Sequence, residues 1–137
     1  MRKWIAAATL VIALVAATAP QASASSAPIV IPYAKTCDAE TGRCVGTAGD
    51  GTIVMQVTSF RATGDAAHLT FTEWVTDGDI SFTAEMAGTF SPAGFIVLNG
   101  TVTEGSFAGA QVHQRSNLVD PVANTWTGEL QIMPASA

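Results

Sequence analysis

Apolar and polar residues alternate along most of the chain after residue 51. The segment 80–86 shows this most clearly, because every second residue is apolar and the residues between are polar. The apolar positions are Ile80, Phe82, Ala84 and Met86. A period of two is the pattern of a β-strand with one face in a core. No stretch beyond the first 24 residues has the spacing of an amphipathic helix, so the pattern predicts an all-β domain.

Glycine, aspartate, asparagine and proline interrupt the apolar runs and predict tight turns between strands. The expected strands are 52–61, 68–76, 80–86, 95–103, 107–119 and 126–133. Two shorter segments, 29–36 and 44–47, could add a strand each, which gives six to eight strands. Short turns favour a small antiparallel up-and-down β-barrel, whose closure leaves no unpaired edge. A two-sheet sandwich is the alternative, but it needs some long crossovers.

The first 24 residues have the pattern of a secretory signal peptide. Two basic residues follow the initial methionine and precede an apolar run over 4–19, and residues 22–24 read Ala-Ser-Ala. We expect cleavage after Ala24, which leaves 25–137 as a single secreted domain without a stable membrane anchor. A transmembrane anchor is the alternative, but Pro20 ends the run before it reaches the roughly 20 residues that span a bilayer.

Charge narrows the choice of partners. After removal of the signal peptide the chain has four basic and 11 acidic residues, a net charge near −7. An acidic surface repels phosphate groups, so nucleic acid and anionic membranes are not expected partners. The abundance of alanine, glycine and threonine indicates a bacterial source.

The two cysteines, Cys37 and Cys44, are expected to form a disulfide, because they lie close together in an exported chain. Closing so short a loop contributes about 2 to 3 kcal/mol of stability. A zinc site is the alternative, but zinc needs four ligands and the nearest histidine is His68. We therefore predict no metal and no cofactor.

No motif identifies a catalytic residue. No serine lies in a Gly-x-Ser-x-Gly turn, and both cysteines are committed to the expected disulfide. Most aromatic side chains are expected to fill the core, and Trp126, at the start of the last predicted strand, is expected to cap one barrel mouth. The sequence thus leaves enzymatic activity open and inclines against it.

Two charged residues fall on apolar strand faces. Arg61 lies on the apolar face of 52–61, and Glu73 lies on that of 68–76. Without a bulge both side chains point inward, where an unpaired charge is costly and calls for an ion pair or a ligand. A one-residue bulge near Glu73 is the alternative, and it would bring Trp74 inside instead. The candidate ligand-binding residues are Glu73, Arg61, Trp74 and His113.

Three segments carry a family resemblance. Residues 105–112 (Gly-Ser-Phe-Ala-Gly-Ala-Gln-Val) place a small-residue turn and an aromatic before a long strand, and 88–90 and 96–102 repeat a rhythm of glycine, threonine and strand. Over 52–133 the chain resembles the calycin-like barrels of allene oxide cyclases and dirigent proteins. The resemblance implies an eight-stranded barrel with an apolar ligand in its lumen. An inward Glu73 would be similar to an acidic residue in such a cavity, and no catalytic role is carried over.

The sequence therefore predicts a secreted β-barrel that binds an apolar small molecule or acts as an extracellular accessory protein. One alternative is an isomerase or cyclase that uses Glu73 for proton transfer in the lumen. Another is a surface-interaction or inhibitory module that acts through the loop 37–44. A real lumen distinguishes the first two from the third, and room beside Glu73 distinguishes the enzyme from the carrier.

Overall fold

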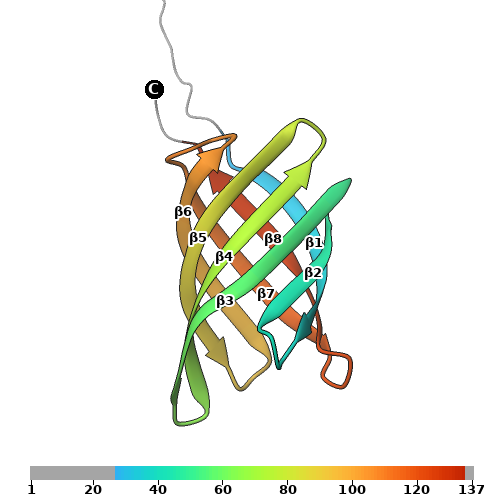
Figure 1. Ribbon diagram of the computed structural model, residues 1–137, viewed down its shortest axis with the longest axis vertical. Coiled ribbons are helices and arrows are strands. Elements are labelled where there is room, and N and C mark those ends of the chain that lie inside the picture. Colours follow the sequence, from blue (N-terminus) through green and yellow to red (C-terminus); the bar gives the residue numbers. More distant parts are fainter. Residues whose placement is uncertain (1–26, 135–137) are drawn as a thin grey trace, which may run out of the picture.

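Eight strands joined by tight turns close into one antiparallel barrel in the computed structural model, which describes residues 27–134 (Figure 1). The strands are β1 (Ile29–Asp38), β2 (Arg43–Ala48), β3 (Gly51–Thr63), β4 (Ala66–Asp77), β5 (Ile80–Ser91), β6 (Phe95–Gly105), β7 (Gln111–Asp120) and β8 (Thr125–Met133). They pair in chain order, and β1 closes the barrel against β8. The all-β prediction is confirmed. The strands form a closed barrel, so the two-sheet sandwich alternative is wrong.

Both optional segments are strands, so the upper limit of the predicted count is the correct one. The predicted strand 107–119 begins later than expected, at Gln111. Phe107 and Gly109 have φ angles of 63° and 91°, which a continuous strand does not allow, so the residues before Gln111 form a turn. The predicted signal peptide lies outside the described residues. None of the described residues belongs to a helix long and apolar enough to cross a membrane.

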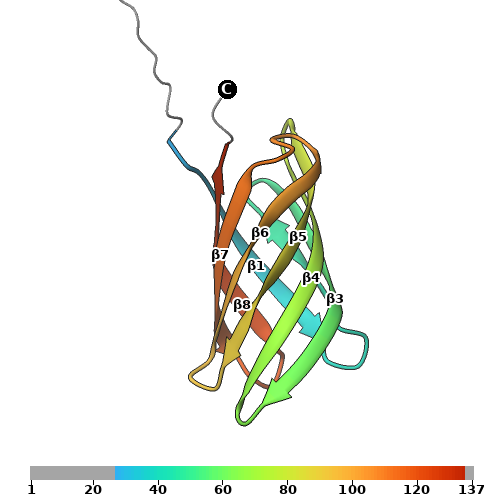
Figure 2. The same cartoon turned by 90° about the vertical axis from the view of Figure 1, so that its left-hand side faces the viewer.

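The inward faces of the strands form one core. Burial alternates along β4 and β5, as the period-two pattern predicts. Figure 2 shows the strands inclined to the long axis of the barrel, which closure of a twisted sheet requires. The large side chains that are almost fully buried include Ile31, Ile53, Met55, Val75, Met86, Leu98, Leu130 and Ile132. They pack the middle of the barrel and the end near the chain termini.

A bulge in β3 overturns one expectation about orientation. The register between β3 and β4 shifts between Val57 and Ser59, which reverses the faces of the residues that follow. Arg61 therefore pairs with the exposed His68 and is itself exposed, while Phe60, which is 64% exposed, lies at the mouth of a pocket in the barrel end. The prediction that Arg61 points inward is wrong for this reason.

No shift interrupts the register of β4 around Glu73. The residue pairs with Met55 on one side and with Ala84 on the other, and its side chain is 0% exposed. Its inward orientation is confirmed. Trp74 follows the alternation to the outer surface, where it is 42% exposed, so the alternative that exchanged these two residues is wrong.

Candidate functional site

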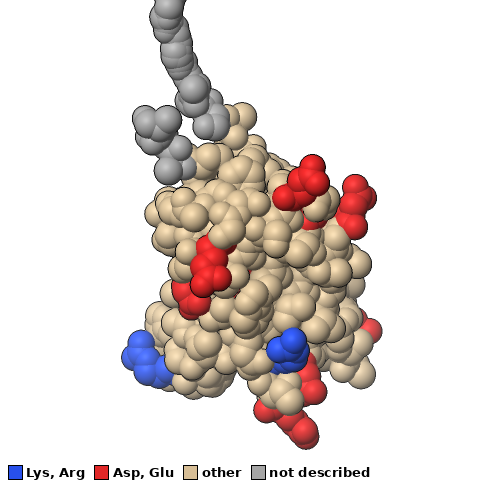
Figure 3. Space-filling model, turned by 45° about the horizontal axis from the view of Figure 1, so that its top comes forward, with Lys and Arg blue, Asp and Glu red and all other residues tan. Residues whose placement is uncertain are grey.

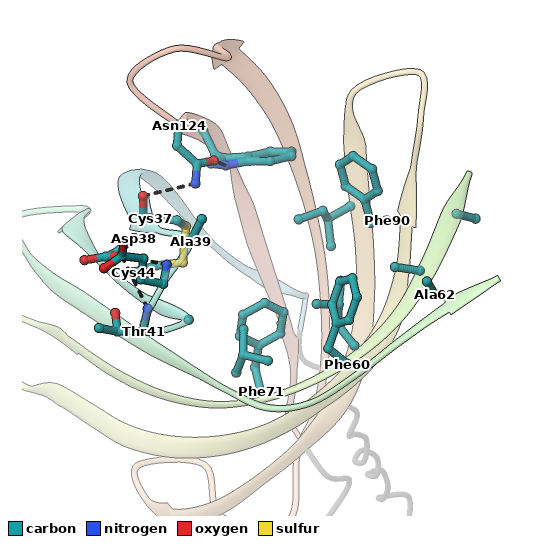
Figure 4. Close-up of a pocket in the computed structure, with 18 of the residues that line it drawn as sticks. Cys37, Asp38, Ala39, Thr41, Cys44, Phe60, Ala62, Phe71, Phe90 and Asn124 are labelled. Carbon is teal, nitrogen blue, oxygen red and sulfur yellow. Dashed lines mark hydrogen bonds between the residues drawn. A yellow bond between two sulfur atoms is a disulfide. The ribbon is translucent and has the colours of Figure 1, made fainter. Parts of the chain in front are cut away.

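One end of the barrel holds an apolar pocket of about 770 Å³, which we call the end pocket. It lies among the turns that connect β1 to β2, β3 to β4 and β7 to β8, away from the chain termini (Figures 1 and 4). Its main apolar side chains are Phe60, Leu69, Phe71, Phe90, Ile96 and Trp126. Pockets of this size and character accept small apolar molecules. The barrel is therefore packed in its middle and hollow at one end.

The disulfide and Asn124 fix one wall of this pocket. Cys37 and Cys44 face each other on β1 and β2 and are bonded, as predicted. Asn124 has a φ of 60°, a conformation that asparagine tolerates better than most residues. Its side chain donates to the carbonyl of Cys37 at 3.1 Å and accepts from the indole nitrogen of Trp126 at 2.8 Å. These contacts hold two neighbouring turns together at the pocket mouth.

Trp126 lies at the barrel mouth, as expected from its place in the sequence. Its side chain is buried and meets the ring of Phe90 edge to face, with 6.2 Å between the ring centroids. Figure 4 shows Phe60, Phe71 and Phe90 lining the opposite side of the cavity from Asn124 and the disulfide. An apolar molecule in the end pocket would thus contact aromatic rings on several sides.

The charged residues that line the pocket are all acidic. Asp38, Glu40 and Asp65 lie at its rim, and none of the described basic residues does. The Asp38 carboxylate accepts the backbone N–H groups of Glu40 and Thr41, which fixes it within the turn. Elsewhere, the face in Figure 3 carries few charges, separated by broad uncharged surface. The rim therefore favours neutral or cationic end groups over carboxylates.

A buried polar cluster lies deeper in the barrel. Glu73, Gln114, Ser116 and Tyr33 are all almost completely buried. The amide of Gln114 satisfies its neighbours when its nitrogen donates to the two Glu73 oxygens, at 2.9 and 3.3 Å, and its oxygen accepts from the Tyr33 hydroxyl at 3.2 Å. The Tyr33 hydroxyl also hydrogen-bonds to Ser116. These bonds offset part of the cost of burying polar groups.

Gly128 allows Tyr33 to join this cluster. Gly128 lies on β8, where it pairs with Tyr33 of β1 on one side and with Ser116 of β7 on the other. A Cβ atom at Gly128 would lie 2.8 Å from the Tyr33 hydroxyl oxygen. The missing side chain thus leaves a gap in β8 through which β1 and β7 exchange a hydrogen bond.

Lys35 is the second buried charge, at 3% exposure. Its amine donates to the Met55 sulfur at 3.2 Å, and it lies 5.6 Å from the ring centroids of both Tyr33 and Phe71. A thioether is a weak acceptor, whereas aromatic faces attract a cation. Within the described residues no carboxylate oxygen lies within 4.0 Å of the Lys35 amine. Glu73 therefore acts on it through space and not by direct contact.

Burial shifts the pKa values of both charged groups toward each other. Loss of hydration lowers the pKa of Lys35 to about 8, an effect that the negative charge of Glu73 partly opposes. Loss of hydration also raises the pKa of Glu73 to about 8, and Lys35 partly opposes that change. Burial raises the pKa of Tyr33 to about 12, against the hydrogen bonds from Ser116 and Gln114. Burial thus favours the uncharged form of both Lys35 and Glu73.

Phe71 connects the end pocket with this cluster. Its ring lines the pocket (Figure 4). The same ring faces the amine of Lys35, 5.6 Å from the ring centroid. Neither Lys35 nor Glu73 lines the pocket itself. The aromatic ring is thus the floor that separates a bound molecule from the buried charges.

The structure does not bring the four predicted ligand-binding residues together. Glu73 is inside the barrel, whereas Arg61, Trp74 and His113 lie on its outer side. His113 is half-buried there, and its Nδ1 hydrogen-bonds to Asn99 at 2.7 Å. Neither Trp74 nor His113 lines the end pocket.

Sequence reasoning missed Lys35, Tyr33, Gln114 and Ser116. A signal for Lys35 was present, because it shares the parity of Ile31 and Tyr33 in the segment 29–36. Nothing in the sequence indicated that Lys35 lies near Glu73, because the two residues lie on strands that only barrel closure brings together.

No family model, curated protein or solved structure matches the chain. Among residues 27–134, no group of three or more His, Cys, Asp or Glu side chains is placed to hold a metal ion.

Proposed function

We propose that the protein is a secreted carrier that binds an apolar small molecule in the end pocket. The observation that supports this proposal is the cavity of about 770 Å³ in an otherwise packed barrel, with aromatic and aliphatic side chains on its walls. Apolar surface left open to water is unfavourable, so a large apolar hollow in a small domain favours a binding role. The resemblance to allene oxide cyclase and dirigent barrels is compatible with a ligand in the lumen.

The geometry favours a carrier over an isomerase or cyclase. A general acid or base must come within hydrogen-bonding reach of the reacting atom, about 3 Å. Glu73 does not line the end pocket, and its oxygens are occupied by Gln114. The loop 37–44, the basis of the surface-module alternative, contributes to the rim of the pocket, which gives it a role in ligand entry.

Filling the pocket should weaken binding of an apolar probe. We expect the neutral fluorophore N-phenyl-1-naphthylamine to bind the natural protein saturably, with one site. Ala67 is buried and lines the pocket, so Ala67→Phe should weaken the affinity at least about tenfold, because the added ring occupies the space of the probe. Fluorescence titration measures the effect.

The matched control is Ala87→Phe, which makes the same change at an exposed position of β5. It should leave the affinity unchanged. Absence of saturable binding to the natural protein, or equal affinities of the two variants, would contradict the carrier proposal.

Secretion is the second part of the proposal, supported by the signal-peptide pattern and by the disulfide, which persists mainly outside the cytosol. The full chain expressed in a bacterial host should be exported and begin at Ser25, as N-terminal sequencing would show. Ala22→Arg together with Ala24→Arg should block this cleavage, because a signal peptidase requires small residues there. Exported protein that still begins at Met1 would refute the predicted cleavage.

A further inference from the structure

Lys35 is the only lysine in the part of the chain that the structure describes, and it lies inside the barrel. Lysine is normally a surface residue, because its charged amine is costly to bury. Here the amine has a thioether as its hydrogen-bond acceptor and two aromatic rings as neighbours. It is a buried primary amine next to a sulfur atom and two aromatic rings, without a carboxylate oxygen within 4.0 Å among the described residues.

The amine of Lys35 lies close enough to the end pocket for a molecule bound there to reach it after a small rearrangement. The Phe71 ring, which the amine faces at 5.6 Å from its centroid, belongs both to the pocket lining and to the surroundings of Lys35. Trp126, the partner of Lys35 on β8, also lines the pocket. We expect displacement of the Phe71 ring to open a path from the pocket toward the amine. Buried lysine amines are a class of groups that form imines with carbonyl compounds.

We propose that Lys35 captures uncharged apolar aldehydes that enter the end pocket, as a covalent imine. This inference rests on the proposed binding function and adds the class of ligand. Once the Phe71 ring has moved aside, the ammonium releases a proton to solvent in the pocket, and the neutral amine attacks the carbonyl carbon. The resulting carbinolamine loses one water molecule, so one amine and one aldehyde give one imine and one water. No oxidant or reductant takes part.

The pocket selects among aldehydes by charge and polarity. The acidic rim disfavours aldehydes that carry a carboxylate or phosphate, and the aromatic lining favours a long apolar chain. The lowered pKa of Lys35, about 8, increases the fraction of neutral amine at mildly alkaline pH. Imine formation should therefore become faster as the pH rises toward 8 and should favour aldehydes such as decanal.

Reductive trapping tests the proposal. The mature protein is incubated with decanal and cyanoborohydride at pH 8, and intact mass followed by peptide mapping locates the decyl group. We expect one adduct on Lys35, distinguishable from any adduct on the terminal α-amine. Lys35→Arg should lose that adduct, by about twentyfold or more, because a guanidinium does not form a stable imine under these conditions. Circular dichroism and probe binding verify that this variant is folded.

Phe71→Ala provides a second test that does not alter the amine. Removal of the ring should accelerate labelling of Lys35 by about threefold or more, because it opens the pocket floor. Trp74→Ala, on the outer face of the same strand, is the control and should leave the rate unchanged.

The outcomes separate the two proposals. Labelling of the α-amine alone, with intact probe binding, overturns imine capture and leaves the carrier. Absence of saturable probe binding to the natural protein overturns the carrier proposal itself. Labelling of Lys35 by glyoxylate as fast as by decanal would show that the amine reacts without the pocket, which contradicts the proposed selectivity.

Discussion

The contribution of the buried charges to the free energy of unfolding should pass through a minimum near pH 8. Glu73 has a pKa of 4.5 when exposed and about 8 in the barrel, so its contribution is complete below pH 4.5 and is lost as the pH rises to 8. Lys35 changes from 10.5 to about 8, so its contribution is complete above pH 10.5 and is lost as the pH falls to 8. Each side of the minimum should slope by about 1 kcal/mol per pH unit.

Urea unfolding at a series of pH values measures this effect. The reference is the double variant Lys35→Met with Glu73→Gln, which lacks both titrating groups and keeps side chains of similar volume. The difference in unfolding free energy between the natural protein and this variant removes the contributions of the surface carboxylates. A difference that does not change with pH, or that is largest near pH 8 in favour of the natural protein, would contradict the assignment.

The barrel itself was predictable because its signals are local. Alternation along 80–86 and the turn residues between strands depend only on neighbouring positions, and they specify antiparallel neighbours. The inward position of Glu73 followed from the same alternation. The predicted inward orientation of Arg61 was wrong because the segment around Val57 and Ser59 mixes apolar and polar residues, and its sequence does not reveal the bulge there.

The end pocket and the charge pair could not be predicted in this way. A cavity depends on whether side chains from β4, β5, β6 and β8 together fill one end of the barrel, and composition does not determine that. Lys35 and Glu73 interact across the interior, from β1 and β4, so their coupling depends on closure and register. Hence the fold could be predicted from pattern, and the site only in part.

Replacing either buried charge alone should destabilise the protein by more than half as much as replacing both charges together. Lys35→Met leaves Glu73 in the barrel without a positive neighbour, and Glu73→Gln leaves Lys35 without a negative one. Each change should lower the free energy of unfolding at pH 8 by about 1 to 3 kcal/mol, because the group that remains must either stay charged without its partner or become neutral. The double variant should lose less than the two single losses together, with a coupling of about 1 to 3 kcal/mol.

Arg115 and Glu129 offer a matched comparison on the outer surface. They pair across β7 and β8 and are both exposed, so water screens their attraction. The cycle of Arg115→Met and Glu129→Gln should give a coupling below about 1 kcal/mol, and added salt should reduce it further. A coupling between Lys35 and Glu73 no larger than this, and equally sensitive to salt, would mean that water reaches the barrel interior. Lys35 would then be an ordinary solvated lysine, and the buried amine on which imine capture depends would not exist.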